Sequence, residues 1–169
     1  MPVKRAIPPN NGMFFIIFIG YQWLSLMDTI NEYDIIYKWF DHLKSNHHFI
    51  NGYAIMPNQV HALISFINTM QSINTSSAMI KDLWCMKLLT GGKKYEITLL
   101  EHLAGGVEAT RKINKKLHEV RELFFDWKDR RSNEFVWHKL DYMHNNSCRG
   151  KRQLAVNAIE YIHSIARFI

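Results

Sequence analysis

Residues 53–66 read YAIMPNQVHALISF, which is two apolar stretches on either side of Pro57 and Asn58. Pro-Asn is a turn dipeptide, and the residue before a proline is held extended, so the segment predicts two adjacent strands joined by a tight turn. Side chains alternate between the two faces of a strand, so Gln59 and His61 should project from the same face of the second strand. Two ligand-type groups on one face can share one metal ion.

The neighbouring residues predict a strand, helix, strand, strand order. Residues 14–19 form an apolar run rich in Phe and Ile, as in a central strand, and the apolar side chains of residues 29–46 recur at helical spacing. Farther along the chain, Ser132 suits the N-cap of a helix that should continue to about Asn145. No internal repeat or clear linker divides the chain. We therefore predict a single α+β domain over residues 1–169, with residues 1–12 flexible.

The middle of the chain has a less regular pattern. Residues 70–90 suggest a loop followed by a helix that ends at two glycines, and residues 97–103 suggest a second short helix. Residues 111–121 are rich in Lys and Arg, and residues 123–127 suggest another short strand. A solvated helix face is the usual explanation of such a basic run, and contact with nucleic acid is the alternative.

Charge and composition narrow the class of protein. The chain has 169 residues, a formal net charge of +6 and 47% hydrophobic residues, which suits a compact domain that can attract polyanions. Its 2 cysteines have no paired spacing, so neither a zinc knuckle nor a disulfide framework is indicated. The apolar run at residues 13–19 is too short to cross a bilayer and lacks the features of a signal peptide. We expect a cytoplasmic protein that does not bind membranes.

A candidate nucleophile lies on the helix predicted after Ser132. His138, Tyr142 and Asn146 are four residues apart, so they share one helix face if the helix reaches Asn146. A tyrosine phenol becomes a useful nucleophile when a metal-bound phosphate is brought to it. A boundary tyrosine and a hydrogen-bonded structural histidine are the commoner explanations of Tyr142 and His61, so spacing alone does not establish a site.

Two segments resemble a known family. Residues 56–64, MPNQVHALI, resemble the metal-binding strand of the single-tyrosine HUH transposases, and residues 139–146, KLDYMHNN, are similar to the helix that bears the nucleophilic tyrosine in the REP-associated, insertion-sequence-like branch. Residues 18–24, FIGYQWL, and residues 160–164, EYIHS, also resemble that branch. The resemblance therefore reaches most of the chain and is least clear in residues 70–120.

The resemblance implies a ferredoxin-like antiparallel sheet with helices packed on it, in a protein that commonly works as a homodimer. It also implies an enzyme that cuts single-stranded DNA beside a hairpin. Tyr142 would attack a phosphodiester and become joined to the 5′ phosphate, with release of a 3′ hydroxyl. A divalent cation, Mg²⁺ or Mn²⁺, would be held by Gln59, His61 and Asn146.

The sequence departs from the family at the first histidine of the metal-binding pair, where it has Gln59. An amide oxygen is a weak, neutral donor, so this ligand set would hold Mg²⁺ poorly, which puts catalysis in question. His138 is a possible substitute ligand, and a partly exposed helix histidine is its other interpretation. A second departure is Ser147, where relatives usually have proline. The alternative function is a catalytically impaired DNA-binding or regulatory protein of the same fold. A third, unrelated reading is a basic structural or protein-interaction domain.

Basic side chains are the candidate contacts to DNA phosphates, which position DNA without reading its sequence. The candidates are Lys81, Arg111, Lys112, Lys115, Lys116, Arg149 and Lys151.

Overall fold

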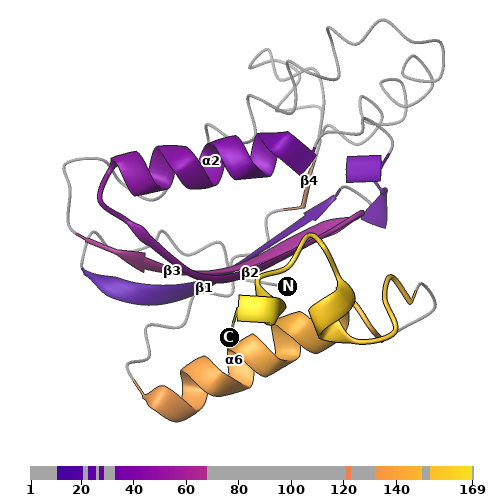
Figure 1. The fold of residues 1–169 in the computed structure, drawn as a ribbon. Helices are drawn as coiled ribbons and strands as arrows, with labels where there is room; N and C mark the ends of the chain where they lie inside the picture. Colours follow the sequence, from indigo (N-terminus) through magenta and orange to yellow (C-terminus); the bar gives the residue numbers. More distant parts are fainter. Residues whose placement is uncertain are drawn as a thin grey trace, which may run out of the picture.

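In the part of the chain that the structure describes, a 4-stranded antiparallel sheet lies between the helices (Figure 1). Its strands are β1 (Gly12–Gly20), β2 (Phe49–Met56), β3 (Gln59–Phe66) and β4 (Arg121–Glu122), in the spatial order β2-β3-β1-β4. This is the strand order of a ferredoxin-like sheet, so the predicted α+β fold class is confirmed. The computed structural model describes residues 11–20, 23–25, 27–28, 33–67, 121–122, 132–149 and 153–168.

The predicted pair of strands around Pro57 and Asn58 is confirmed. Met56 and Gln59 are the last paired residues before the turn, and β3 also pairs with β1 from Phe66 to Gln59. β3 is therefore a central strand, and its nearly continuous apolar sequence reflects burial of side chains on both of its faces. A bulge in the pairing lies between Ile50 and Gly52 of β2.

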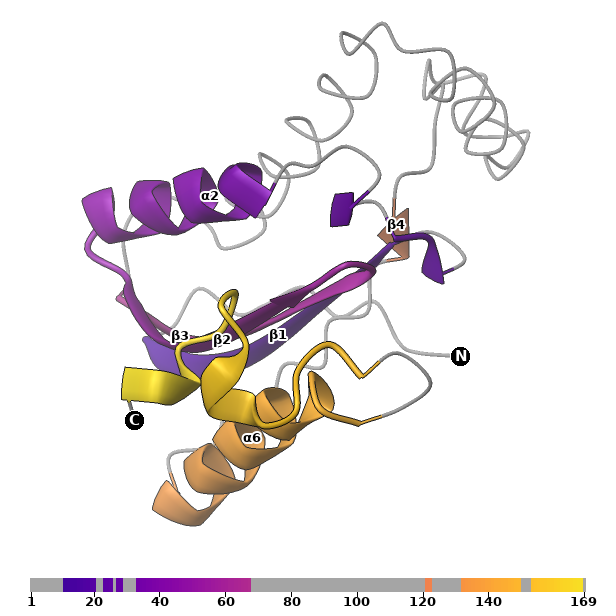
Figure 2. The ribbon, with the colours of Figure 1, turned by 45° about the vertical axis from the view of Figure 1, so that its right-hand side comes forward.

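Two helices cover opposite faces of the sheet, as Figures 1 and 2 show from two directions. Helix α2 (Tyr33–Ser45) buries Trp39 and Phe40 in a cluster with Phe14, Ile16 and Phe18 of β1. Helix α6 (Asn133–Asn146) packs Leu140 and Met143 against Phe15 and Leu63 on the other face. Alternate residues of β1 thus belong to different cores, as the two-residue repeat of a strand requires.

The ends of α6 are held by two serines. The Ser132 hydroxyl oxygen accepts a hydrogen bond from the Phe135 backbone N–H at 3.3 Å, which confirms the predicted N-cap. At the other end the Ser147 hydroxyl donates to the His144 carbonyl at 2.8 Å, and the Cys148 N–H donates to the Asn145 carbonyl at 3.1 Å. These bonds satisfy carbonyls of the last turn of α6.

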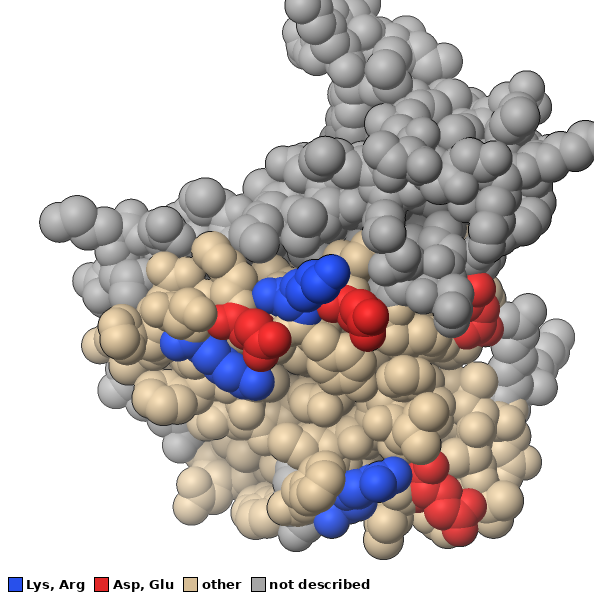
Figure 3. Space-filling view, turned by 45° about the horizontal axis from the view of Figure 1, so that its top comes forward, with Lys and Arg blue, Asp and Glu red and all other residues tan. Residues whose placement is uncertain are grey.

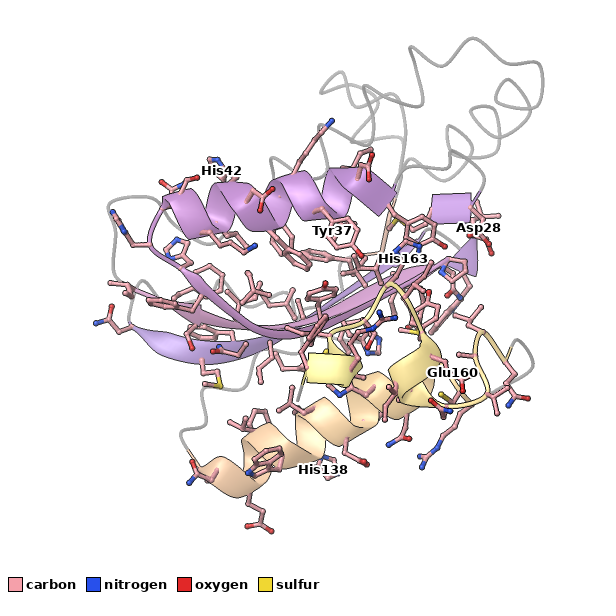
Figure 4. The ribbon with its side chains drawn as sticks, viewed as in Figure 1. Asp28, Tyr37, His42, His138, Glu160 and His163 are labelled. Atoms are coloured by element: carbon pink, nitrogen blue, oxygen red, sulfur yellow. The ribbon has the colours of Figure 1, made fainter. Side chains whose placement is uncertain are left out.

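The C-terminal segment, residues 153–168, runs back along the outer edge of β2. It contains two short 3₁₀ helices, η2 (Ala158–Glu160) and η3 (Ala166–Phe168). The Ile55 N–H donates to the His163 carbonyl at 2.8 Å, and the Ile165 N–H donates to the Tyr53 carbonyl at 3.2 Å. Figure 4 shows His163 beside Tyr37 of α2, where Tyr37 Oη and His163 Nδ1 are 3.1 Å apart. The segment therefore joins the sheet edge to α2.

Some expectations from the sequence differ from the structure, and others concern residues that the structure does not describe. Gly12, which the sequence analysis assigned to the N-terminal segment, is the first residue of β1. The two-residue strand β4 begins at Arg121, the last residue of the basic run, and ends just before residues 123–127, where a strand was predicted. The helices predicted within residues 70–103 and the strand predicted at residues 123–127 lie outside the described residues, as do residues 1–10. Among the residues that the structure describes, no helix is long and apolar enough to span a membrane.

Candidate active site

His61 lies on the face of β3 that α6 covers, and only 1% of its surface is exposed. Its Nε2 atom is 3.1 Å from Oε1 of Gln59, two residues earlier on the same face. Because that amide oxygen can only accept, this contact requires the imidazole proton on Nε2. Nδ1 then carries the lone pair, and it is buried with no hydrogen-bond partner in the described part of the chain.

Burial also fixes the charge of His61. Desolvation, assisted by the positive charge of Lys139, lowers the pKa of this imidazole from its usual 6.5 to about 3. The ring is therefore neutral at physiological pH, which is the form that ligates metals.

Tyr142 of α6 stacks on His61. The two ring centroids are 5.6 Å apart and the ring planes differ by 8°. Phe15 of β1 sets its edge against both rings, at 5.8 Å from His61 and 6.3 Å from Tyr142. The tyrosine remains 44% exposed. Its ring is thus fixed by the sheet while part of the side chain stays open to an external substrate, as a nucleophile requires.

Gly52 of β2 allows α6 to lie this close to the sheet. A Cβ atom at this position would be 2.5 Å from Cδ2 of Leu140 and 2.9 Å from Cε of Met143. Both residues are buried on α6 and flank Tyr142 in sequence. The missing side chain at Gly52 therefore helps to set the position of the candidate nucleophile.

Lys139 is a cation of this site that the sequence did not single out. Its Nζ atom lies 4.6 Å from the Phe15 ring centroid, 5.6 Å from that of Phe135 and 5.8 Å from that of Tyr142. Its place three residues before Tyr142, on the same side of a helix, is the signal that could have revealed it.

The other candidates on α6 lie in different positions. Asn146 is the last residue of the helix, one turn beyond Tyr142, and is half-buried. His138 is exposed, and Figure 4 shows it on the side of α6 away from the sheet, so the structure does not bring it to His61. His144, which the sequence analysis did not consider, is buried, and its Nε2 has no hydrogen-bond partner among the described residues.

Most of the candidate DNA contacts lie outside the described residues, namely Lys81, Arg111, Lys112, Lys115, Lys116 and Lys151. Arg149 is described and is exposed just after α6. On the face drawn in Figure 3, basic and acidic side chains lie next to each other. This face of the described surface therefore has mixed charge.

Gln59 and His61, two of the three predicted ligands, lie next to each other on β3. The 3.1 Å between His61 Nε2 and Gln59 Oε1 is the length of the hydrogen bond between them, so a cation held by both atoms would have to replace that bond. The neutral imidazole could supply the Nε2 lone pair only after a change of tautomer. Neither group carries a negative charge. In the part of the chain that the structure describes, no cluster of three or more His, Cys, Asp or Glu side chains could hold a metal.

Comparison with solved structures finds chains of similar fold. One of them belongs to a structure described as a REP-associated tyrosine transposase bound to a REP hairpin. The fold resembles that of a tyrosine transposase. The alignment has a TM-score of 0.65 and covers 99% of this chain and 84% of the transposase chain. Sequence identity is 14%, so the likeness is one of fold. No protein-family model and no curated protein matches the chain.

Proposed function

We propose that the protein binds single-stranded or hairpin DNA and nicks and rejoins it through a 5′-phosphotyrosine intermediate on Tyr142. The observation that carries the proposal is the partly exposed Tyr142 stacked on the buried, neutral His61 beside Gln59. The transposase-like fold supports it, because the solved transposase of this fold is bound to a DNA hairpin. A second copy of the chain is the expected protein partner.

The reaction requires one bond exchange at phosphorus. The Tyr142 oxygen forms a bond to the phosphorus, the bond to the 3′ oxygen breaks, and the phenol proton is lost while the 3′ oxygen gains one. Attack by a 3′ hydroxyl on the phosphotyrosine reverses the exchange and rejoins the strand. Contacts with His61 and Phe15 orient the tyrosine ring before the reaction. This orientation lowers the entropy cost of reaching the transition state. Mg²⁺ or Mn²⁺, when held by Gln59, His61 and Asn146, would polarise the phosphate.

The alternative function is hairpin recognition or regulation without cleavage, and one contact favours it. Gln59 Oε1 and His61 Nε2 bind each other, so a cation must displace a hydrogen bond between the two groups that would hold it. In a protein that binds no metal, Gln59 and His61 can serve as hydrogen-bonded packing residues between β3 and α6.

A covalent-adduct assay tests the proposal. The protein is incubated with Mn²⁺ and a hairpin that carries a single-stranded flank, and the products are separated on a denaturing gel. A 3′ label should move with the protein, because the protein joins the 5′ phosphate of the downstream fragment. A 5′ label should appear on a shorter free strand whose 3′ hydroxyl a polymerase can extend. Tight binding without an adduct would instead support the non-cleaving alternative.

DNA binding is expected to weaken steeply as salt rises. Each phosphate contact to a single strand contributes about 0.7 to the slope of log affinity against log salt concentration. Fluorescence anisotropy at several salt concentrations measures this slope. Arg149→Ala should reduce the slope by about 0.7, whereas Arg167→Ala at the C-terminus serves as the matched control. Absent binding, or binding indifferent to salt, would favour a structural or protein-interaction domain.

Gln59→His is expected to increase Mn²⁺ affinity by about tenfold or more, because imidazole is a stronger donor than an amide oxygen to transition-metal ions. Isothermal titration calorimetry with MnCl₂ measures the change without any need for activity. Gln59→Leu, which has no donor atom, should bind Mn²⁺ more weakly than the original protein. Equal affinities for the three proteins would refute the assignment of Gln59 as a ligand.

A further inference from the structure

Three aromatic rings surround the ammonium group of Lys139, at the edge of the candidate active site. Its Nζ atom is closest to Phe15, at 4.6 Å from the ring centroid, and 5.8 Å from the centroid of Tyr142. Lys139 itself is half-buried, with its side chain packed among these rings. The positive charge is therefore held within reach of any group that approaches Tyr142.

Lys139 brings a positive charge to a site whose predicted polar groups include two uncharged amides, Gln59 and Asn146. Lys139 shares α6 with Tyr142, three residues earlier in the chain, and its Nζ atom lies close to the tyrosine ring. Its charge therefore lies beside the proposed nucleophile.

We propose that Lys139 binds the non-bridging oxygens of the scissile phosphate and stabilises the negative charge that develops there as Tyr142 attacks. This inference rests on the proposed function and adds a phosphate-binding residue to it. A phosphate oxygen is a stronger partner for an ammonium group than the face of an aromatic ring is. Lysine suits this role because its ammonium is a compact charge with three donors on a flexible stem. No proton moves to or from Lys139 in this step.

The geometry also explains how a site with Gln59 can retain chemistry. A cation held weakly by Gln59 neutralises less of the negative charge of the phosphate than a cation held firmly by two histidines would. The Lys139 ammonium group, 5.8 Å from the Tyr142 ring centroid, supplies a positive charge that does not depend on metal concentration. Lys139 therefore makes strand cleavage less dependent on the ligand strength of Gln59.

Two variants separate the charge of Lys139 from its packing. Lys139→Met keeps a long apolar stem against Phe15, and Lys139→Arg keeps the positive charge. We expect Lys139→Met to slow single-turnover adduct formation by about 100-fold, the size of effect typical of losing one charge-stabilising group, and Lys139→Arg to recover most of the rate. Lys38→Met, an exposed lysine on α2 across the sheet, is the matched control and should react at the original rate.

A neutral substrate shows whether the charge acts on the phosphate. With a methylphosphonate at the scissile position, the difference between the original protein and Lys139→Met should shrink from about 100-fold toward onefold, because the non-bridging negative charge is gone. A Lys139→Met protein that reacts as fast as the original on ordinary DNA would overturn the proposal. An equal loss on both substrates would also overturn it, since that result indicates a packing role.

A binding measurement keeps the inference testable if no adduct forms at all. Lys139→Met should lower the slope of log affinity against log salt by about 0.7, with Lys38→Met unchanged. A lowered slope without any adduct would refute nicking and leave the phosphate contact standing. An adduct whose rate and salt slope are both indifferent to Lys139 would leave nicking standing and refute the phosphate contact.

Discussion

A Tyr142→Phe protein should form no covalent DNA adduct, a loss of at least about a hundredfold, and should still bind hairpin DNA with the original affinity. The substitution removes only the oxygen that would bond to phosphorus, and nucleophilic catalysis has no substitute for that atom. The phenyl ring can keep its stacking on His61 and its edge contact with Phe15, so the fold should be unaffected. Denaturing gels measure the adduct, and fluorescence anisotropy measures DNA binding on the same samples.

Tyr53→Phe is the matched control for this experiment. Tyr53 lies on β2 and packs with the core on the α2 face, on the other side of the sheet from Tyr142. Its conversion to phenylalanine should leave adduct formation within twofold of the original. An adduct of normal yield in Tyr142→Phe would show that another residue is the nucleophile and would remove the basis of the proposed site.

Gly52→Val is expected to destabilise the protein by about 1–3 kcal/mol and to reduce adduct formation as well. A branched side chain at this position meets Leu140 and Met143, whose nearest atoms already lie within 3 Å of where its Cβ would be. Those two side chains must turn away or α6 must move outward. Either change shifts the segment that holds Tyr142 over His61. Urea unfolding followed by circular dichroism gives the change in free energy of unfolding.

Phe49→Val controls for the effect of valine in β2. Phe49 begins the same strand and is 57% exposed, so its replacement should change stability by no more than about 0.5 kcal/mol. Combining Gly52→Val with Leu140→Ala should cost less than the sum of the two single changes, because the smaller side chain makes room for valine. Strict additivity would show that valine at Gly52 does not collide with α6.

The parts of the fold predicted correctly from the sequence are those encoded by short-range patterns. Alternation along residues 59–66 assigned Gln59 and His61 to one face, and the pairing of β3 with β1 and β2 confirms that assignment. The turn at Pro57 and the N-cap at Ser132 were also predicted correctly, because each depends on chemistry within four residues.

The arrangement of the site was harder to predict because it depends on contacts across the sheet. Helical spacing indicates which residues of α6 share a side, but it does not say that this side covers His61 rather than the core beneath α2. Lys139 was overlooked because a lysine on a helix usually faces solvent, and only the position of Phe15 shows otherwise. Likewise, β4 has two residues, which is too short to produce a recognisable alternation.

The pairing of the C-terminal segment with β2 restricts how two copies of the chain can assemble. An unpaired edge strand readily recruits a strand from another molecule. Here the backbone groups of Tyr53 and Ile55 are bonded to Ile165 and His163 of the same chain, and the Tyr161 hydroxyl donates to the Ile55 carbonyl at 2.6 Å. A continuous intermolecular sheet cannot form across this part of β2 while the segment is in place. Residues 161–165 thus shield this part of the sheet edge from the strand addition that leads to fibrous self-association.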